Sequence, residues 1–232
     1  MTQPDAPAVL STEEAAAYWD SRHRRRGELA SGGNVHFDEP TNEIFYAVRL
    51  GRLLEIVGDA NAAAEPLRLL DAGCGKGWFA RAMARFGHGV DAIDASPAAI
   101  EACRAVSAAS AATPGAGPAY SVSTLSAWAP ACLYDVVYSV DVLFHIVDDA
   151  EWAASVRSLA ALVRLGGLLA VSDWDVPEPR VLGSYQVVRA RPQYDELLAA
   201  RGFERAPLGD DGFVPDGFRG SPVGFHVFRR IG

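Results

Sequence analysis

Residues 67–77 read Leu67-Arg68-Leu69-Leu70-Asp71-Ala72-Gly73-Cys74-Gly75-Lys76-Gly77, and this stretch decides the fold. An apolar run ends at an acid, and three glycines follow at alternate positions. The next segment, 78–84, carries apolar residues at helical spacing. This order predicts a buried parallel strand, a tight turn and a helix. Glycine permits positive φ and the helix start presents free N–H groups, so the turn is a candidate pocket for a polar or anionic small molecule.

Two common nucleotide-binding motifs do not fit this turn. A dinucleotide fingerprint needs a third Gly or Ala where this chain has Trp78, and a P-loop needs Ser or Thr after the lysine where this chain has Gly77. The pattern that remains, an acid followed by Gly-x-Gly-x-Gly over residues 71–77, resembles motif I of the class I S-adenosylmethionine-dependent methyltransferases. The resemblance implies S-adenosylmethionine as cofactor and S-adenosylhomocysteine as product.

A second acid stands at the end of the next predicted strand. Residues 89–94 read as a strand that ends at Asp94, 23 residues beyond Asp71. An acid at this distance can accept hydrogen bonds from both ribose hydroxyls of an adenosine-containing ligand. It matches the motif II acid of the family, and Ala95 and Ser96 resemble the family's continuation. Ser96-Pro97 predicts the start of the following helix.

The third predicted strand, 119–122, ends in a departure from the family pattern. The family has an acid just after this strand, near the adenine amino group, whereas this chain has Thr124. The usual adenine contact is therefore expected to be absent or replaced by a hydroxyl or backbone group. The resemblance assigns cofactor binding to Asp71, Gly73, Cys74, Gly75, Asp94, Ala95, Ser96, Thr124, Leu125 and Ser139.

Residues 133–149 hold the candidate catalytic groups. Residues 135–138 read as a buried strand that resembles the family's fourth, and its end at 139–141 is expected where the methionine part of the cofactor meets the substrate. His145 follows and could be a general base, because its unperturbed pKa lies near neutrality; a capping or supporting role is the alternative. Asp141 and Asp173 could act as the base or orient it. No metal site is expected, because these acids lack the family's metal-binding spacing.

The predicted fold is α/β, with a Rossmann-like, mostly parallel seven-stranded sheet, helices on both faces and a helical N-terminal extension. Residues 1–65 are expected to form this extension as a substrate cap, with helices at 12–25 and 42–57 separated by a polar loop at 27–40. Residues 66–232 are expected to form the cofactor-binding domain, ending in a connection at 210–222 and an antiparallel strand at 223–229. Candidate substrate-binding residues are Tyr18, Trp19, His36, Tyr46 and Arg49 in the extension and Trp174 in the polar loop 173–180.

Composition limits the range of partners. The 232 residues suit one domain, and a net charge of −8 disfavours bulk nucleic acid or an anionic membrane as the main partner. The basic cluster 22–26 reads as a solvated helix face. No signal peptide and no transmembrane run are evident, so a cytoplasmic protein is expected. The three cysteines are too far apart in sequence to favour a zinc site or a disulfide framework.

Three functions remain open from the sequence. The first is methyl transfer to a hydroxyl or amine of a small molecule, in the biosynthesis or tailoring of a metabolite or natural product. The second is an S-adenosylmethionine-binding relative repurposed for a non-methylating reaction, since fold does not fix function. The third is an RNA or protein methyltransferase, supported only by the arginine cluster. Two copies could pair as a homodimer through a sheet edge or the N-terminal helices.

Overall fold

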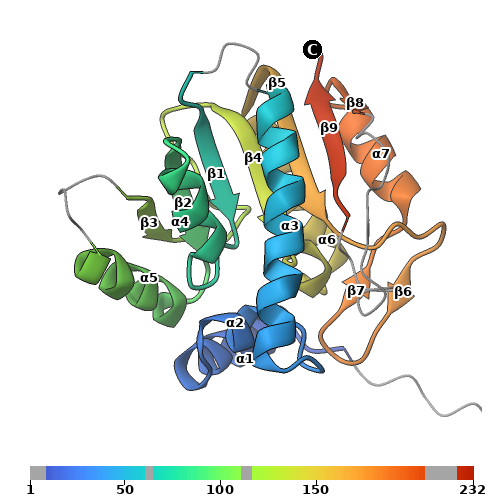
Figure 1. Cartoon of the computed structure of the whole chain (residues 1–232). Helices are drawn as coiled ribbons and strands as arrows, with labels where there is room; N and C mark the ends of the chain where they lie inside the picture. Colours follow the sequence, from blue (N-terminus) through green and yellow to red (C-terminus); the bar gives the residue numbers. More distant parts are fainter. Residues whose placement is uncertain (1–8, 61–64, 111–116, 207–223) are drawn as a thin grey trace, which may run out of the picture.

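A computed structural model of the chain describes residues 9–60, 65–110, 117–206 and 224–232. In this part of the chain, seven strands form one sheet in the order β3-β2-β1-β4-β5-β9-β8 (Figure 1). All neighbouring strands pair in parallel except β9, which is antiparallel to both β5 and β8. The strands are β1 (Arg68–Ala72), β2 (Gly89–Asp94), β3 (Ala119–Val122), β4 (Tyr134–Val140), β5 (Val163–Ser172), β8 (Phe203–Arg205) and β9 (His226–Arg230).

Helices cover both faces of the sheet. The first face packs against α3 (Glu39–Ala60), α4 (Trp78–Arg85) and α5 (Pro97–Ser110), and the second against α6 (Asp149–Ala161) and α7 (Arg191–Ala199). Strand β5 shows why both faces are covered. The side chains of Leu168 and Ala170 pack into the apolar core on the first face, and those of Leu169 and Val171 pack into the core on the second. A strand buried on both faces needs apolar residues at every position, which is why these strands read as continuous apolar runs.

The N-terminal helices lie at the end of the sheet to which the parallel strands point. Helix α1 (Thr12–Arg25) and the short α2 (Glu28–Gly32) sit there below β1 and α5 in Figure 1. A capping box formed by Ser11 and Glu14 starts α1, as the sequence predicts. Ligands of open α/β sheets bind beyond the carboxyl ends of the strands. Helix α1 is therefore placed to cover a ligand site.

The structure confirms the predicted fold class and the antiparallel last strand, and it corrects three local predictions. The loop expected at 27–40 contains α2, and α3 begins at Glu39 and runs to Ala60. The polar loop after β5 leads into a small hairpin, β6 (Arg180–Val181) and β7 (Val187–Val188). These elements are short or depend on tertiary contacts, so hydrophobic periodicity does not reveal them. The predicted connection 210–222 lies outside the described residues.

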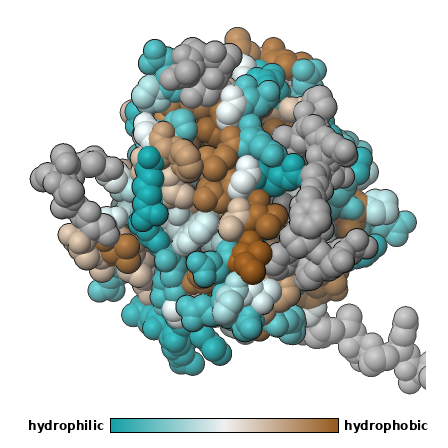
Figure 2. Space-filling model, viewed as in Figure 1, coloured by the Kyte–Doolittle hydropathy of each residue, from teal (hydrophilic) through white to brown (hydrophobic). Residues whose placement is uncertain are grey.

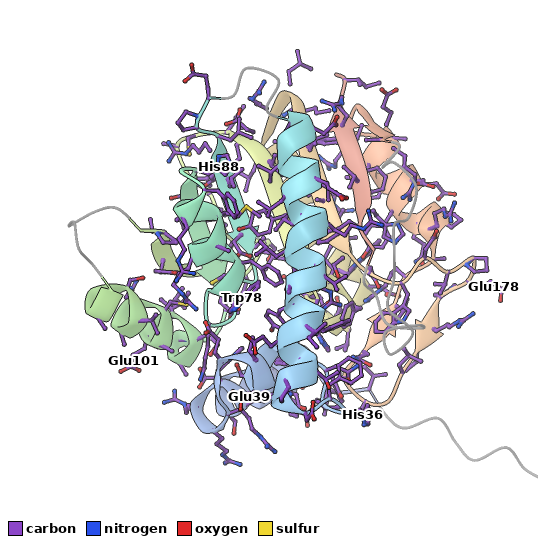
Figure 3. The ribbon with its side chains drawn as sticks, in the orientation of Figure 1. His36, Glu39, Trp78, His88, Glu101 and Glu178 are labelled. Atoms are coloured by element: carbon purple, nitrogen blue, oxygen red, sulfur yellow. The ribbon has the colours of Figure 1, made fainter. Side chains whose placement is uncertain are left out.

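Hydrophobic and hydrophilic surfaces alternate on the face that carries α3 (Figure 2). Large exposed apolar side chains come from many different elements, and they include Ile44, Phe86, Val122, Leu165 and Ile231. Surface apolar residues of this kind are normal in globular proteins. His36 is exposed near the start of α3, and Glu101 points outward from α5 (Figure 3). Within the described ranges no helix combines the length and the apolar character that a membrane span requires.

A buried arginine joins the β6–β7 hairpin to the turn after β4. Arg189, 1% exposed, donates hydrogen bonds to the carbonyl oxygens of Ile146 (2.6 Å), Val187 (2.8 Å) and Val147 (3.2 Å), and its Nη2 lies 2.8 Å from Asp149. The guanidinium therefore satisfies acceptors from two segments at once.

We expect Arg189→Met to lower the free energy of unfolding by about 3 kcal/mol, because these acceptors would lose their donors while remaining poorly hydrated. Urea denaturation followed by circular dichroism measures the change. Arg201→Met, at an exposed position, is the matched control and should change stability by less than about 0.5 kcal/mol. Equal effects of the two substitutions would contradict the assigned role.

Candidate cofactor and acceptor site

The glycine turn is folded against the end of β2. The N–H groups of Gly73 and Cys74 both donate to the carbonyl oxygen of Ile93, each at 2.8 Å. Gly73, Gly75 and Gly77 all have positive φ. A Cβ at Gly73 would lie 2.4 Å from a methyl carbon of Val142, so glycine is required there for space as well as for conformation. The turn thus brings backbone N–H groups and the ends of β1 and β2 together.

Asp94 links this turn to the start of α5. One carboxylate oxygen accepts from the N–H of Gly75 (2.9 Å) and the other from the N–H of Ser96 (2.8 Å). Burial raises the pKa of Asp94, although these hydrogen bonds and nearby His23 oppose the rise. Each carboxylate oxygen has two lone-pair sites, so acceptor capacity remains for a ligand.

Helix α1 is fastened over the same region. Asp20 accepts hydrogen bonds from the Ser96 hydroxyl (2.7 Å) and the Ala98 N–H (3.1 Å) at the start of α5. Tyr18 stacks on Tyr185 of the β6–β7 hairpin with ring centroids 5.2 Å apart, and the N–H of Leu10 donates to the carbonyl of Ser184 at 2.8 Å. The helix is therefore held at both ends, by α5 and by the hairpin.

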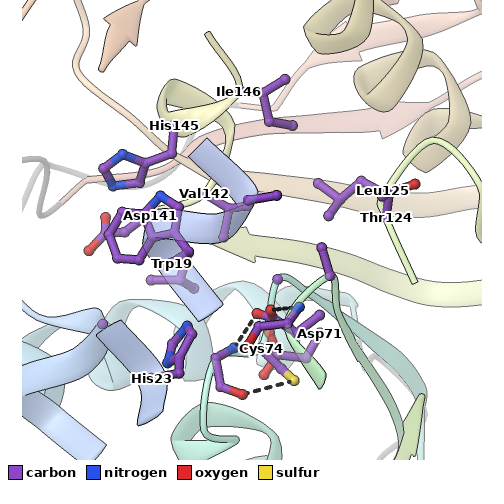
Figure 4. Close-up of a pocket in the computed structure, with 18 of the residues that line it drawn as sticks. Trp19, His23, Asp71, Cys74, Thr124, Leu125, Asp141, Val142, His145 and Ile146 are labelled. Carbon is purple, nitrogen blue, oxygen red and sulfur yellow. Dashed lines mark hydrogen bonds between the residues drawn. The ribbon is translucent and has the colours of Figure 1, made fainter. Parts of the chain in front are cut away.

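A cavity of about 220 Å³ lies between α1 and the strand ends. In Figure 4, Trp19 and His23 of α1 lie on the side of the cavity away from Thr124 and Leu125. The sequence-predicted residues that line it are Trp19, Tyr46, Asp71, Gly73, Cys74, Gly75, Asp94, Ala95, Ser96, Thr124, Leu125, Asp141 and His145. One continuous space thus joins residues from α1, the glycine turn and the ends of β2, β3 and β4.

Four buried polar atoms of the lining have no hydrogen-bond partner within the described part of the chain. They are Trp19 Nε1, His23 Nδ1, Asp71 Oδ2 and Ser155 Oγ. A buried polar group without a partner costs about 1–3 kcal/mol, so such atoms mark places where a ligand or water is expected to bind. Their spread over the cavity favours a ligand with polar groups along its length.

Burial keeps Asp71 and His145 uncharged near neutral pH. It raises the pKa of Asp71 to about 8, and the charge of nearby Asp94 adds to the rise. It lowers the pKa of His145 to about 4. His145 Nδ1 lies 3.0 Å from the carbonyl oxygen of Tyr185. That oxygen can only accept, so Nδ1 carries the proton and Nε2 keeps a free lone pair.

Aromatic rings hold the His145 imidazole in place. Its centroid lies 4.4 Å from Trp19, 4.4 Å from Phe144 and 5.6 Å from Tyr185, on which it stacks. These rings come from α1, the turn after β4 and the β6–β7 hairpin. The orientation of His145 therefore depends on the position of α1.

Asp141 adopts positive φ (59°), the only such non-glycine residue among those described. Its carboxylate is paired with Arg49, which is 1% exposed and stacks on Phe45, and it accepts from the Ser172 hydroxyl at 2.8 Å. Burial raises the pKa of Asp141, whereas Arg49 and Ser172 lower it. Because the charge has a buried counter-ion, this arrangement suits a polar anchor better than a free base.

Six predicted site residues lie outside the cavity lining, and one of them, His36, is exposed just before α3. Asp173 accepts from the Tyr194 hydroxyl (2.6 Å) and the Trp174 N–H (2.7 Å), and burial raises its pKa to about 7. Ser139 is buried and donates to the Ala72 carbonyl at 2.8 Å. Trp174 packs on Phe144, whereas Tyr18 and Arg49 support Tyr185 and Asp141 from behind.

Several lining residues were not predicted from the sequence, among them His23, Glu151 and Ser155. His23 follows Trp19 by four residues on a capped helix, and Ser155 follows Glu151 by four on α6. Residues four apart share one helix face, so the predicted role of Trp19 in the site could have pointed to His23 as well. Within the described residues no cluster of three or more metal-ligating side chains is present.

Comparison with known proteins agrees with this architecture. The family model described as a methyltransferase domain matches residues 21–205. Among curated relatives, the ubiquinone biosynthesis O-methyltransferase of Methylocella silvestris is 42% identical over 106 residues, covering 45% of this chain and 39% of the relative. The enzyme of the same name from Caulobacter sp. strain K31 is 33% identical over 158 residues, covering 68% of this chain and 58% of the relative. The chain thus spans less than two thirds of the length of these relatives.

Among solved structures, magnesium protoporphyrin IX methyltransferase from Synechocystis PCC 6803 with bound S-adenosylhomocysteine superposes with a TM-score of 0.67 at 20% identity. The match covers 94% of this chain and 98% of that one. At this identity the likeness establishes the fold. With the family match, it shows that the chain belongs to the class I S-adenosylmethionine-dependent methyltransferases.

The raised pKa of Asp71 predicts a pH-dependent stability difference. The folded protein holds this proton up to about pH 8, whereas the unfolded chain releases it near pH 4. Between these values the folded state binds more protons, so the stability of the wild type should fall as pH rises.

We expect Asp71→Asn to gain at least about 1 kcal/mol of stability relative to the wild type on going from pH 5 to pH 8, because it has no proton to lose. Paired urea denaturation at several pH values measures this difference, and subtracting the two curves removes the contribution of other groups such as Asp173. A difference that does not vary with pH would show that Asp71 is ionised throughout.

Proposed function

We propose that this chain transfers the methyl group of S-adenosylmethionine to a hydroxyl group of a small, largely apolar molecule. The observation that carries the proposal is one cavity that joins the glycine turn and Asp94 to a neutral, oriented histidine under α1. The names of the curated relatives, O-methyltransferases of ubiquinone biosynthesis, favour oxygen over nitrogen as the methylated atom. The biosynthesis or tailoring of a cytoplasmic metabolite is the setting we propose.

The residues of the cavity fit the parts of S-adenosylmethionine. Asp94 retains acceptor sites for two ribose hydroxyls, and the turn at Gly73–Gly75 leaves room for close approach of the ligand. The unpartnered oxygen of Asp71 would accept a hydrogen bond from the ammonium group of the methionine part. When bound, the cofactor supplies an electrophilic methyl group on a positively charged sulfur.

The part of the cavity beneath α1 favours an apolar acceptor. Thr12, Ala15, Ala16, Ile146 and Val147 line it beside Trp19 and His145. Such a lining excludes water and holds a mostly hydrocarbon or aromatic molecule, while a few polar groups set its orientation. The acceptor hydroxyl would lie against His145, with Tyr46 and Asp141 as further polar groups of the lining.

His145 would position and deprotonate the acceptor. Its Nε2 lone pair accepts the hydrogen bond of the hydroxyl, which directs an oxygen lone pair toward the methyl group. A bound cofactor would give up its methyl group to the hydroxyl oxygen and keep the bonding electron pair on its sulfur. The hydroxyl proton passes to Nε2 and later to solvent. A pKa of about 4 makes the free imidazole a weak base, so transfer depends on the hydroxyl becoming acidic as the new bond forms.

The arginine cluster gives little support to a macromolecular acceptor. Arg22 donates to the carbonyls of Ser31 (2.7 Å) and Ala30 (2.8 Å), and Arg24 pairs with Asp20 at 2.8 Å. Part of the cluster is therefore engaged within the fold, and we do not propose RNA as the substrate.

The experiment that tests the proposal begins with calorimetric titration of S-adenosylhomocysteine and, separately, of NADH. We expect micromolar binding of the first and none of the second. Hydroxylated aromatic compounds are then screened with S-adenosylmethionine for release of S-adenosylhomocysteine. No binding of S-adenosylhomocysteine would refute the proposal at its first step, and release with amines alone would refute the choice of oxygen.

Asp94→Ala should weaken S-adenosylhomocysteine binding by about 2–4 kcal/mol, because the ribose hydroxyls would lose a charged acceptor. Glu101→Ala, on the outward face of α5, is the control and should leave the affinity unchanged. The dissociation constants come from the same titration. Equal affinities for Asp94→Ala and the wild type would show that the ribose lies elsewhere.

His145→Gln should lower kcat by two to four orders of magnitude, because glutamine keeps a hydrogen-bond acceptor but cannot take the proton. Binding of S-adenosylhomocysteine should change less than about threefold. Because burial lowers the pKa of His145 to about 4, the imidazole stays neutral well below pH 6.5, and its protonation should not reduce the wild-type kcat between pH 8 and pH 5.5. A kcat of His145→Gln within threefold of the wild-type value would rule out His145 as the base.

A further inference from the structure

One end of the cavity lies beyond Asp94, on the side of strand β3. Strand β3 is the neighbour of β2 at the edge of the sheet, and Thr124 and Leu125, just after it, line the cavity. Glu151 and Ser155 of α6 line it as well. Figure 4 shows Thr124 and Leu125 on the side away from His23 and His145. If Asp94 holds the ribose and Asp71 the methionine part, the adenine ring must extend toward this end.

A chain of hydroxyl groups connects Thr124 to Glu151. The Ser126 Oγ lies 2.6 Å from Glu151 Oε1, and the Thr124 Oγ1 lies 3.2 Å from the Ser126 Oγ. An ionised carboxylate can only accept, so Ser126 donates its single proton to Glu151. Thr124 must then donate its own proton to Ser126. The hydroxyl oxygen of Thr124 is left with lone pairs alone, and it can only accept from a ligand.

Glu151 and Ser155 add polar capacity at the same place. Within the described residues the second carboxylate oxygen of Glu151 makes no hydrogen bond, and the buried hydroxyl of Ser155 also lacks a partner. The two side chains are four residues apart on α6 and so share one face. A buried unpaired hydroxyl beside a carboxylate is costly unless a ligand engages it.

We propose that Glu151, acting through Ser126 on Thr124, makes this end of the cavity an acceptor site for the 6-amino group of adenine. The inference rests on the proposed function and goes beyond it by naming the residue that selects the base. An amino group donates, so it matches the lone pairs of Thr124. A 6-oxo group accepts, so it meets only other acceptors and is rejected. Glu151 is thus a specificity-determining residue contributed by α6.

The test compares two ligands that differ in the 6-substituent of the ring and at N1, which carries a proton only in the 6-oxo form. Calorimetry measures S-adenosylhomocysteine and S-inosylhomocysteine, in which an oxo group replaces the 6-amino group. The wild type should bind the amino ligand about 100-fold more tightly. Glu151→Gln should reduce the ratio to below about 10-fold, because the neutral amide can donate to Ser126 and allow the hydroxyl chain to reverse.

Two further variants complete the experiment. Glu101→Gln, an exposed change on α5, should keep the wild-type ratio. Thr124→Val keeps the shape of the side chain but removes the acceptor, and it should weaken S-adenosylhomocysteine binding about 10-fold with little effect on the oxo analogue. Thermal unfolding shows whether each variant folds. If Glu151→Gln does not fold, the binding ratio of Thr124→Val tests the proposal in its place.

Each outcome decides between distinct conclusions. A reduced ratio in Glu151→Gln or Thr124→Val supports the assignment. Unchanged ratios in folded variants of both would overturn it, and Glu151 would then serve only as an acid in the first turn of α6, where it interacts favourably with the helix dipole. Failure of the wild type to bind S-adenosylhomocysteine at all would instead refute the proposed function, and this inference with it.

Discussion

The carbonyl group of Ile93 at the end of β2 holds the site together. It accepts the N–H groups of both Gly73 and Cys74, which fixes the turn after β1 against the turn after β2. This contact requires the backbone of the glycine turn to bend sharply, and at position 73 only glycine fits beside Val142. Asp94, the start of α5 and the docking of α1 on that start all follow from where Ile93 places the turn.

A second constraint is the low polarity of the space that this arrangement encloses. The same burial raises the pKa of Asp71 to about 8 and lowers that of His145 to about 4, so both side chains are mostly uncharged near pH 7. A positively charged sulfonium compound would enter a cavity lined by Lys76, whose ammonium group donates to the carbonyl oxygen of Arg26, while Arg49 behind the lining is paired with Asp141. The electrostatic environment is thus set by burial as much as by the identity of the residues.

The sequence predicted the parts of the site that depend on short stretches of chain. The glycine turn and Asp94 sit at the ends of neighbouring strands, and strand order follows from the alternation of strands and helices. The sequence did not predict that Arg49 would lie behind Asp141, or that Glu151 would reach the same end as Thr124. These contacts join segments far apart in the chain, and only packing determines them. The β6–β7 hairpin was missed because its two-residue strands leave no periodic pattern.

The two walls of the cavity have different origins in the chain. The wall formed by strand ends and turns lies inside the segment that matches the methyltransferase-domain family, 21–205. The opposite wall is formed by α1, and its lining residues Thr12, Ala15, Ala16 and Trp19 precede that segment. Substitutions at these α1 residues can alter the shape of the cavity where an acceptor would bind without disturbing the glycine turn or Asp94. Residues 12–19 are therefore a natural place for relatives to differ in the acceptor they bind, and exchanging this segment between relatives would be a direct route to changing that acceptor.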